Sequence, residues 1–243
     1  MEKESLKNGA DANLARRSFL KYAGAGAASL GLLAIASCKK DGTSPSSSLP
    51  GVNDSNFASS GHIDIGSGDY GILNFAYALE QLEAAFYIQV IATPYSGMTP
   101  HERELLTEIR DHEVCHREFF KAALGAKAIP ALTVDFSKID FTSRSAVLGA
   151  AKAFEDTGVE AYDGAGYLIQ NTAYLTIAGK IVSVEARHAA LIRNMIKDGD
   201  YAGPDVVDAN GLNSTLTIAQ VLPIANTYLK TKVSASNYNY TAN

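Results

Sequence analysis

The sequence is poor in cysteine and in positive charge, and its N-terminal apolar run, residues 22–37, is short for a membrane span. The two cysteines are Cys38 and Cys115, and no disulfide can join them if Cys38 is acylated. Lys and Arg number 21 against 26 Asp and Glu; residues 1–37 hold five of the basic and three of the acidic side chains, so 16 against 23 remain beyond them. This acidic balance argues against a nucleic-acid-binding surface.

Residues 1–37 have the three-part layout of an export signal. Arg16 and Arg17 stand shortly before a phenylalanine, a leucine and a lysine, and a run of small and apolar residues follows. An N-terminal membrane anchor is the alternative interpretation, but the run is short and rich in Gly and Ala. The pattern predicts export through the twin-arginine pathway, to the periplasm or to the outer membrane and cell surface.

Cys38 follows Ile-Ala-Ser, and this pattern resembles a lipoprotein processing site. Processing there would make Cys38 the lipid-bearing first residue and attach the protein to a membrane. The alternative is an ordinary signal cleavage that either removes Cys38 or leaves it without a role. The residues that follow are rich in Ser, Pro and Gly without an apolar period, so we expect residues 38–68 to be a lipid-anchored flexible tether.

Helical patterns begin after the expected tether. Residues 69–93 place apolar side chains three and four apart, which is the spacing of a buried helical face. A second helix is predicted to begin after Thr99, because Pro100 suits the first helical position and Glu102 is placed to close a capping box. We expect Gly125 to end it.

A link of about 18 residues without a helical period follows, and it predicts a crossover between the second and third helices. The stretch Ala-Leu-Thr-Val-Asp-Phe within it also suits a short β-hairpin, which is the alternative. Helices are expected at residues 144–170 and 172–197, and a short fifth helix contains Pro223, which should kink it. The predicted fold is an all-α four-helix bundle at residues 69–232, with a disordered tail at 233–243.

Two Glu-x-x-His pairs are the first indication of chemistry: Glu113 with His116, and Glu185 with His188. Residues three apart share one face of a helix, so each pair can reach one ion. Twelve Glu and five His in this chain predict roughly 0.25 such pairs by chance. An exposed charge pair is the ordinary interpretation of one pair alone. Two pairs on separate long helices favour the two halves of one metal site.

A bundle site of this kind needs a further carboxylate from each of the other two helices. On the first helix, Glu83 has apolar residues at its helical spacings and is the predicted ligand. Glu80, three residues earlier, is interpreted as a rim charge or as a partner of a ligand.

The third helix offers Glu155 and Glu160. Glu155 has apolar neighbours at its helical spacings, whereas Glu160 has polar neighbours and is expected to face water. A buried carboxylate is costly without a positive partner, so Glu155 is the predicted ligand. An ion pair of Glu155 with Arg187 or Lys152 is the alternative.

The stretches LEQLEAAFY, DHEVCH, FEDTGVEAY and VEARHAALIR together resemble the bacterial and fungal ferritin-like domain family, within the ferritin-like superfamily of di-iron and di-manganese carboxylate proteins. The resemblance covers about residues 70–230 and implies a ferritin-like bundle. The metal ligands that it implies are Glu83, Glu113, His116, Glu155, Glu185 and His188. Cys115, a thiol beside an expected ligand, departs from the pattern and leaves open whether the site is protected from oxidation or altered.

Three further residues have two interpretations each. His112 could donate to a ligand or replace one, or it could face the surface of its helix. Tyr87 and Tyr162 could donate hydrogen bonds to ligand carboxylates, or lose an electron transiently; core packing is the alternative for both.

The expected chemistry follows from these donors. Oxygen and nitrogen ligands in this ratio suit iron or manganese better than a structural zinc. The leading hypothesis is an exported ferritin-like protein with two iron ions that oxidises Fe(II) or consumes O₂ or peroxide, as an oxidoreductase. The alternatives are a di-manganese catalase and a non-enzymatic envelope stress or binding protein of the same fold. A lipid tether does not suit a closed iron-storage shell. Whether the chain forms a homodimer is left open by the sequence.

Overall fold

The computed structural model describes residues 62–242. The predicted export signal, Cys38 and the tether before residue 62 lie outside the described residues and stay predictions. The described elements, in chain order, are β1 (Ile63–Asp64), α2 (Gly68–Ala92), α3 (Pro100–Leu124), a 3₁₀ turn (Gly125–Lys127), α4 (Arg144–Gly166), α5 (Thr172–Ile196), α6 (Ile218–Asn226), β2 (Val233–Ser234) and a second 3₁₀ turn (Ser236–Tyr238).

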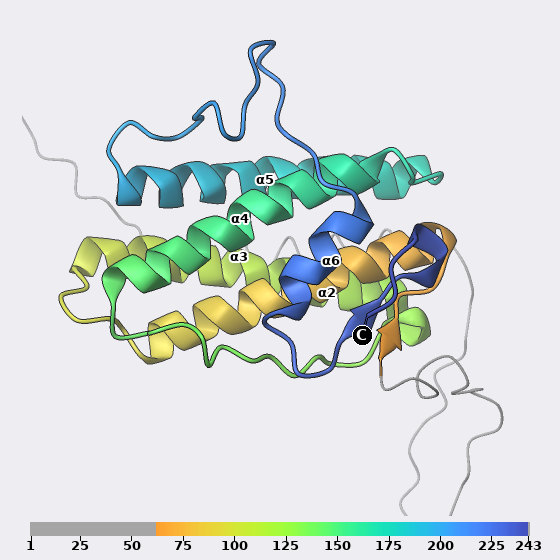
Figure 1. Ribbon diagram of the computed structural model, residues 1–243, viewed down its shortest axis with the longest axis horizontal. Coiled ribbons are helices and arrows are strands. Elements are labelled where there is room, and N and C mark those ends of the chain that lie inside the picture. The colour runs from red at the N-terminus through yellow and green to blue at the C-terminus, as the bar shows by residue number, and fades with distance from the viewer. Residues whose placement is uncertain (1–61, 243) are drawn as a thin grey trace, which may run out of the picture. The chain divides into compact units, whose positions relative to one another are not determined.

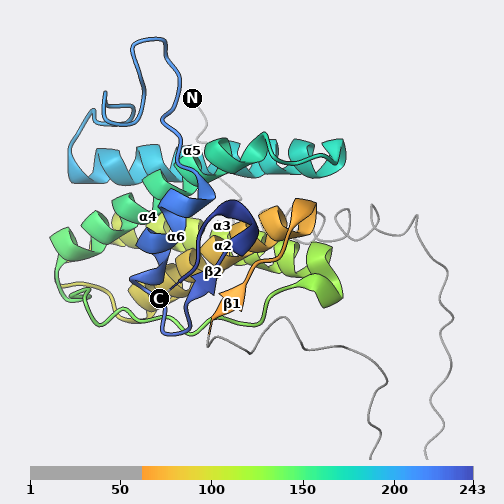
Figure 2. The ribbon, with the colours of Figure 1, turned by 45° about the vertical axis from the view of Figure 1, so that its right-hand side comes forward.

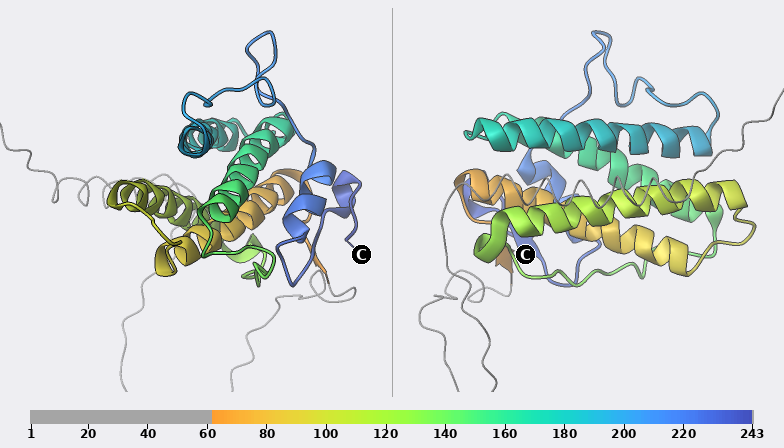
Figure 3. Two further views of the ribbon diagram at one scale, coloured as in Figure 1. Left: turned by 60° about the vertical axis from the view of Figure 1, so that its left-hand side comes forward. Right: turned by 180° about the vertical axis from the view of Figure 1, so that it is seen from behind.

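Four long helices form a bundle from two helical hairpins, α2–α3 and α4–α5 (Figures 1 and 3). The two helices of each hairpin pack along one another, and α2 also contacts α4. The short helix α6 packs against both α2 and α4 (Figure 1). The all-α four-helix bundle with a short fifth helix is therefore confirmed. Within residues 62–242, no helix is both long and apolar enough to span a membrane.

The start of α3 follows from its side chains. Thr99 and Glu102 form the predicted capping box, in which the Glu102 N–H donates to the Thr99 hydroxyl and the Thr99 N–H donates to the Glu102 carboxylate. Pro100 fills the first helical position, where no hydrogen-bond donor is needed.

The end of α4 was predicted too late. The helix ends at Gly166, and not at residue 170, because the backbone N–H groups of Gln170 and Asn171 donate to the Asp69 carboxylate at the start of α2. Those two bonds hold the turn into α5, where the Asn171 side chain caps the new helix.

The core is built around α2, in which every residue from 71 to 84 is buried. Further along α2, the ring of Phe86 packs edge-on against Phe154 of α4, with 5.0 Å between ring centroids. Because α2 is enclosed on all sides, its charged side chains are forced into the interior of the bundle, where they need partners.

The link between α3 and α4 is the predicted crossover and runs along the bundle (Figure 1). It does not form the alternative β-hairpin; Val134 instead makes an isolated bridge with Leu229. Phe136 and Phe141 of the link pack against Phe86, at centroid distances of 5.9 and 5.8 Å. The link therefore closes one side of the core.

The two ends of the domain correct the predicted boundaries. Ile63 and Asp64 fall in the expected tether and Val233 and Ser234 in the expected disordered tail, yet they pair as parallel strands β1 and β2 (Figure 2). Burial is the physical reason, since Ile63 and Val233 are both core residues. The Tyr238 hydroxyl adds a hydrogen bond to the carbonyl oxygen of Gly68. The ordered domain thus reaches beyond residues 69–232 at both ends.

Candidate metal centre

Two of the helices carry the Glu-x-x-His pairs into the bundle. Glu113 and His116 lie on the buried face of α3, and Glu185 and His188 lie on that of α5. Each glutamate is within one turn of its histidine, so the helical repeat alone brings the two side chains together. The bundle then brings the two pairs face to face.

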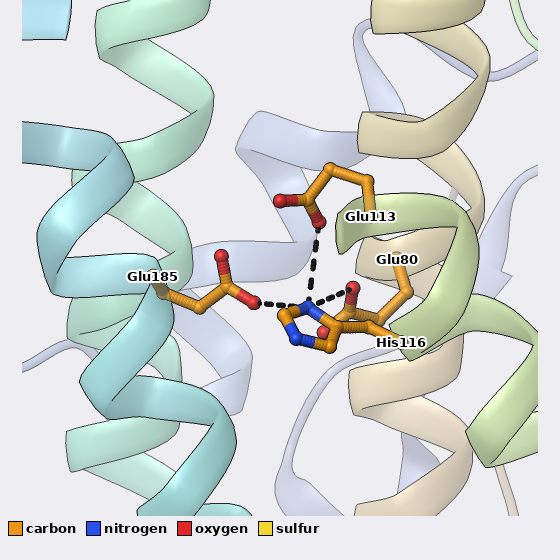
Figure 4. Close-up of side chains that lie close together, drawn as sticks. All are labelled: Glu80, Glu113, His116 and Glu185. Atoms are coloured by element: carbon orange, nitrogen blue, oxygen red, sulfur yellow. Dashed lines mark ion pairs between the residues drawn. The ribbon is translucent and has the colours of Figure 1, made fainter. Parts of the chain in front are cut away.

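The first group of donors surrounds His116, as Figure 4 shows. Its Nδ1 lies 2.6 Å from a carboxylate oxygen of Glu185, 3.5 Å from one of Glu80 and 3.8 Å from one of Glu113. One donor atom from each of these four residues falls within 4.8 Å of the others, and all four residues are buried.

The second group surrounds His188. Its Nδ1 lies 2.8 Å from Glu113 Oε1, 3.0 Å from Glu185 Oε2 and 3.6 Å from Glu155 Oε2. These four residues also bring one donor atom each within 4.8 Å of the others. Glu113 and Glu185 therefore belong to both groups.

The two shared carboxylates are oriented as bridges. Glu113 turns Oε1 to His188 and Oε2 to His116, and Glu185 turns Oε1 to His116 and Oε2 to His188. Each carboxylate thus presents one oxygen to each imidazole. Two cations held in the two groups would share both carboxylates, and each would keep one carboxylate and one histidine of its own.

Unsatisfied polar atoms test whether these residues fit metal ions. Seven buried side-chain oxygen or nitrogen atoms among residues 62–242 have no hydrogen-bond partner, and only one of them, in Tyr95, lies outside the two groups. The other six belong to Glu80, Glu113, His116, Glu155 and Glu185. Their close contacts are ion pairs with His116 or His188, which compensate the buried carboxylates only while the imidazoles are protonated. With neutral imidazoles, cations would take over that role for all six atoms. The donor set of carboxylates and imidazoles therefore fits a dinuclear metal centre.

Two tyrosines hold the carboxylates that are not shared. Tyr162 of α4 donates its hydroxyl to Glu80 Oε1, and Tyr87 of α2 donates to Glu155 Oε1 over 2.6 Å. In both carboxylates the second oxygen, Oε2, faces the donor group without a hydrogen bond. Each tyrosine thus fixes the orientation of a glutamate from the opposite hairpin. The hydrogen bonds to carboxylates that the sequence suggested for both tyrosines are present in the structure.

Burial and crowded charge set the protonation of the site without metal. Burial and the nearby Glu185 raise the pKa of Glu113 to about 8. Burial also works to raise the pKa of Glu185, but contacts with His116 and His188 outweigh it and lower that pKa to about 2. Burial lowers the pKa of both histidines, whereas the surrounding carboxylates, led by Glu80 for His116 and Glu155 for His188, raise it far more. Metal binding must therefore displace protons from this site.

Glu83 lies outside both groups, and Glu80 stands in the first group in its place. The Glu83 carboxylate points toward Gly158 of α4, where an added Cβ would lie 2.9 Å from Glu83 Oε1. Burial, followed by the charge of Glu113, raises the pKa of Glu83 well above its ordinary value. The structure thus brings five of the six predicted side chains together, and their role as ligands stays a prediction.

A signal for Glu80 was present in the sequence. Aligning LEQLEAAFY of α2 with FEDTGVEAY of α4 pairs Glu80 with Glu155 and Tyr87 with Tyr162, and it pairs Glu83 with Gly158. The two hairpins therefore repeat one arrangement, in which Glu80 is the counterpart of Glu155.

His112 stands behind the second group. Its ring stacks on that of His188, with 5.1 Å between centroids, and its Nδ1 lies 2.9 Å from His188 Nε2. This contact is on the side of the imidazole away from the carboxylates, so His112 acts on the orientation of His188. Cys115, next to His116, is partly buried.

Residues around Glu155 settle the alternatives for α4. Lys152 pairs with Asp156 and Asp205, and neither it nor Arg187 pairs with Glu155. Glu160 is half-buried and accepts a hydrogen bond from the Ser214 hydroxyl, so it is less exposed than predicted because the loop after α5 covers it.

A four-helix bundle that gathers carboxylates and histidines from four helices defines a metal-binding helical protein. A family model described as Ferritin-like domain matches residues 68–198, which is more than half of the chain. The chain belongs to this ferritin-like domain family. No curated protein matches the chain.

Proposed function

We propose that this ferritin-like protein is an oxidoreductase whose two iron ions react with O₂ or peroxide. The observation that carries the proposal is the pair of donor groups that share Glu113 and Glu185 and leave six buried atoms without hydrogen bonds. Such a set suits two cations of the same kind placed side by side, and oxygen with imidazole donors suits iron or manganese. Iron bound there would supply the electrons for reducing O₂ or peroxide, because two Fe(II) ions give up two electrons on oxidation.

The chain's own residues would hold and isolate the ions. Glu113 and Glu185 would bridge, while Glu80 with His116 and Glu155 with His188 would complete the two groups. Tyr87 and Tyr162 would keep the unshared carboxylates turned inward. The buried position of these side chains excludes bulk water from the site.

The protein is further proposed to work outside the cytoplasm, anchored by a lipid on Cys38. The support is in the sequence: the Arg16-Arg17 pair, the apolar run after it and the Ile-Ala-Ser stretch before Cys38. A centre that consumes O₂ or peroxide in the cell envelope would protect that compartment.

Metal analysis of the purified full chain tests the proposal. After Fe(II) is added without oxygen and the excess removed, about two iron ions per chain are expected. Admitting O₂ or peroxide should then produce the absorbance of ferric iron. A Glu113→Gln variant should lose most of the metal, whereas Glu104→Gln, at an exposed position on the same helix, should keep it. No bound metal after reconstitution would reject the proposal, and two manganese ions in the native protein would favour peroxide disproportionation.

A further inference from the structure

An apolar cavity of about 30 Å³ lies beside the candidate metal centre, between α2, α3, α4 and α5. Its walls include Ala76, Phe120, Ala165 and Ile177, and they contain no charged side chain. The space suits one small molecule without hydrogen-bonding groups, since a polar molecule would lose its bonds to water there.

The cavity borders the metal centre. Ala76 lies one helical turn before Glu80, and Phe120 lies one turn after His116. Between the cavity and the centre stands Tyr162, whose ring forms part of the wall and whose hydroxyl donates to Glu80. Tyr162 therefore links the cavity wall directly to a carboxylate of the first donor group.

We propose that this cavity binds dioxygen and delivers it to the metal centre past Tyr162. The inference rests on the proposed function and narrows its oxidant to O₂. Dioxygen is small and apolar, so it gains from leaving water for such walls. Hydrogen peroxide and hydrated ions would give up hydrogen bonds to water on entering, and the apolar walls would not replace them.

Xenon reports the cavity without any metal, because it occupies small apolar cavities in proteins. In metal-free full-length protein under xenon pressure, a bound atom is expected between α2, α3, α4 and α5, seen by crystallography or by ¹²⁹Xe NMR. Ala165→Leu fills the cavity and should abolish that signal. Ala225→Leu is the matched control: Ala225 is equally buried but lines a different cavity of about 20 Å³, between α2, α4 and α6, so it should leave the signal intact.

Oxidation kinetics then test delivery. Ala165→Leu should slow oxidation of the Fe(II)-loaded protein by limiting O₂ roughly tenfold, a change equal to about 1.4 kcal/mol of barrier, and leave oxidation by peroxide unchanged. Ala225→Leu should oxidise like the wild type. Ile177→Phe, at the half-buried mouth, is a second filling variant should Ala165→Leu not fold.

Three outcomes would overturn the inference, each in its own way. Absence of xenon from the wild-type cavity overturns it whatever the metal content. Xenon in the cavity together with unchanged O₂ kinetics in both filling variants shows that O₂ arrives elsewhere. A wild type that takes up no iron overturns the proposed function first, and metal analysis identifies that failure before any xenon measurement.

Discussion

The Tyr87 hydroxyl on α2 donates a hydrogen bond to Glu155 on α4 over 2.6 Å. In the opposite direction, the Tyr162 hydroxyl on α4 donates a hydrogen bond to Glu80 on α2. Each helical hairpin therefore orients a carboxylate of the other, and the relative position of the hairpins decides whether the two donor groups exist.

Removing one of these hydroxyls should weaken metal binding. Tyr87→Phe keeps the ring but leaves Glu155 Oε1 buried without its donor, and we expect a loss of about 10–100-fold in metal affinity. The free energy of unfolding of the metal-free protein should fall by about 1–3 kcal/mol. Competition titration with a chelator and denaturant unfolding measure the two effects. Tyr167→Phe, at a position that is 76% exposed, is the control, and an equal loss there would contradict this role.

The shared carboxylates should behave as one unit. Glu113→Ala and Glu185→Ala should each reduce bound metal to a similar degree, because each removes an oxygen donor from both groups. The double variant should lose much less than the sum of the two losses. Elemental analysis of the three variants measures this, and additive losses would place the two Glu-x-x-His pairs in separate sites.

Glu80 and Glu83 should differ as partners of metal. Glu80→Gln is expected to empty the first group in particular, leaving about one ion per chain, because Glu80 belongs to that group alone. Glu83→Gln should keep metal content near that of the wild type, since its carboxylate lies against Gly158. Metal analysis with matched Glu→Gln changes decides between the residues, and the reverse order would restore Glu83 as the ligand.

Stabilisation by metal should increase with pH. The pKa of Glu113 is about 8 in the fold against 4.5 in an unfolded chain, so between these values the folded protein keeps a proton that the unfolded chain has released. The free energy of unfolding without metal therefore falls as pH rises through this range. The raised pKa values of His116 and His188 lower the free energy of unfolding in the same way above pH 6.5. The lowered pKa of Glu185 affects the free energy of unfolding only below pH 4.5.

Metal binding releases these protons, so bound metal stabilises the fold more strongly as pH rises and opposes the fall in the free energy of unfolding. The gap in melting temperature between metal-loaded and metal-free protein should be wider at about pH 8 than at about pH 6. Thermal unfolding with and without chelator measures it. A gap that narrows toward pH 8 would mean that binding does not displace the protons.

Export and anchoring stay predictions of the sequence and can be separated by mutation. The double change Arg16→Lys, Arg17→Lys should leave the protein in the cytoplasm, because the twin-arginine pathway reads the pair. Cys38→Ala should allow export but release the protein from the membrane fraction. Cell fractionation followed by immunoblotting tests both, and normal export of the first variant would reject the twin-arginine pathway.

The sequence predicted most of the fold because long helices carry a periodic pattern and explicit end signals. Thr99, Pro100 and Glu102 placed the start of α3 correctly, since a capping box acts locally. The end of α4 was missed because it depends on Asp69, about a hundred residues away in sequence. Strands of two residues, such as β1 and β2, are too short for a periodic pattern.

Site residues could be predicted where the spacing along one helix brings them together. They were harder to predict where the choice depends on which side chains the bundle buries. The spacing within each Glu-x-x-His pair fixes its geometry, so both pairs could be found from residues alone. Apolar neighbours separated Glu155 from Glu160, because α4 has an exposed face. The same test could not separate Glu80 from Glu83, since α2 is buried all around and both carboxylates point inward.

Pairing of β1 with β2 places the first and last described segments of the domain next to each other. A short peptide could therefore join the two ends, and the chain could be reopened in the exposed loop between α5 and α6 without cutting a helix. Such a circular permutant would retain both helical hairpins. For the same reason the whole domain could be inserted into a surface loop of a host protein, with its donor groups carried along intact.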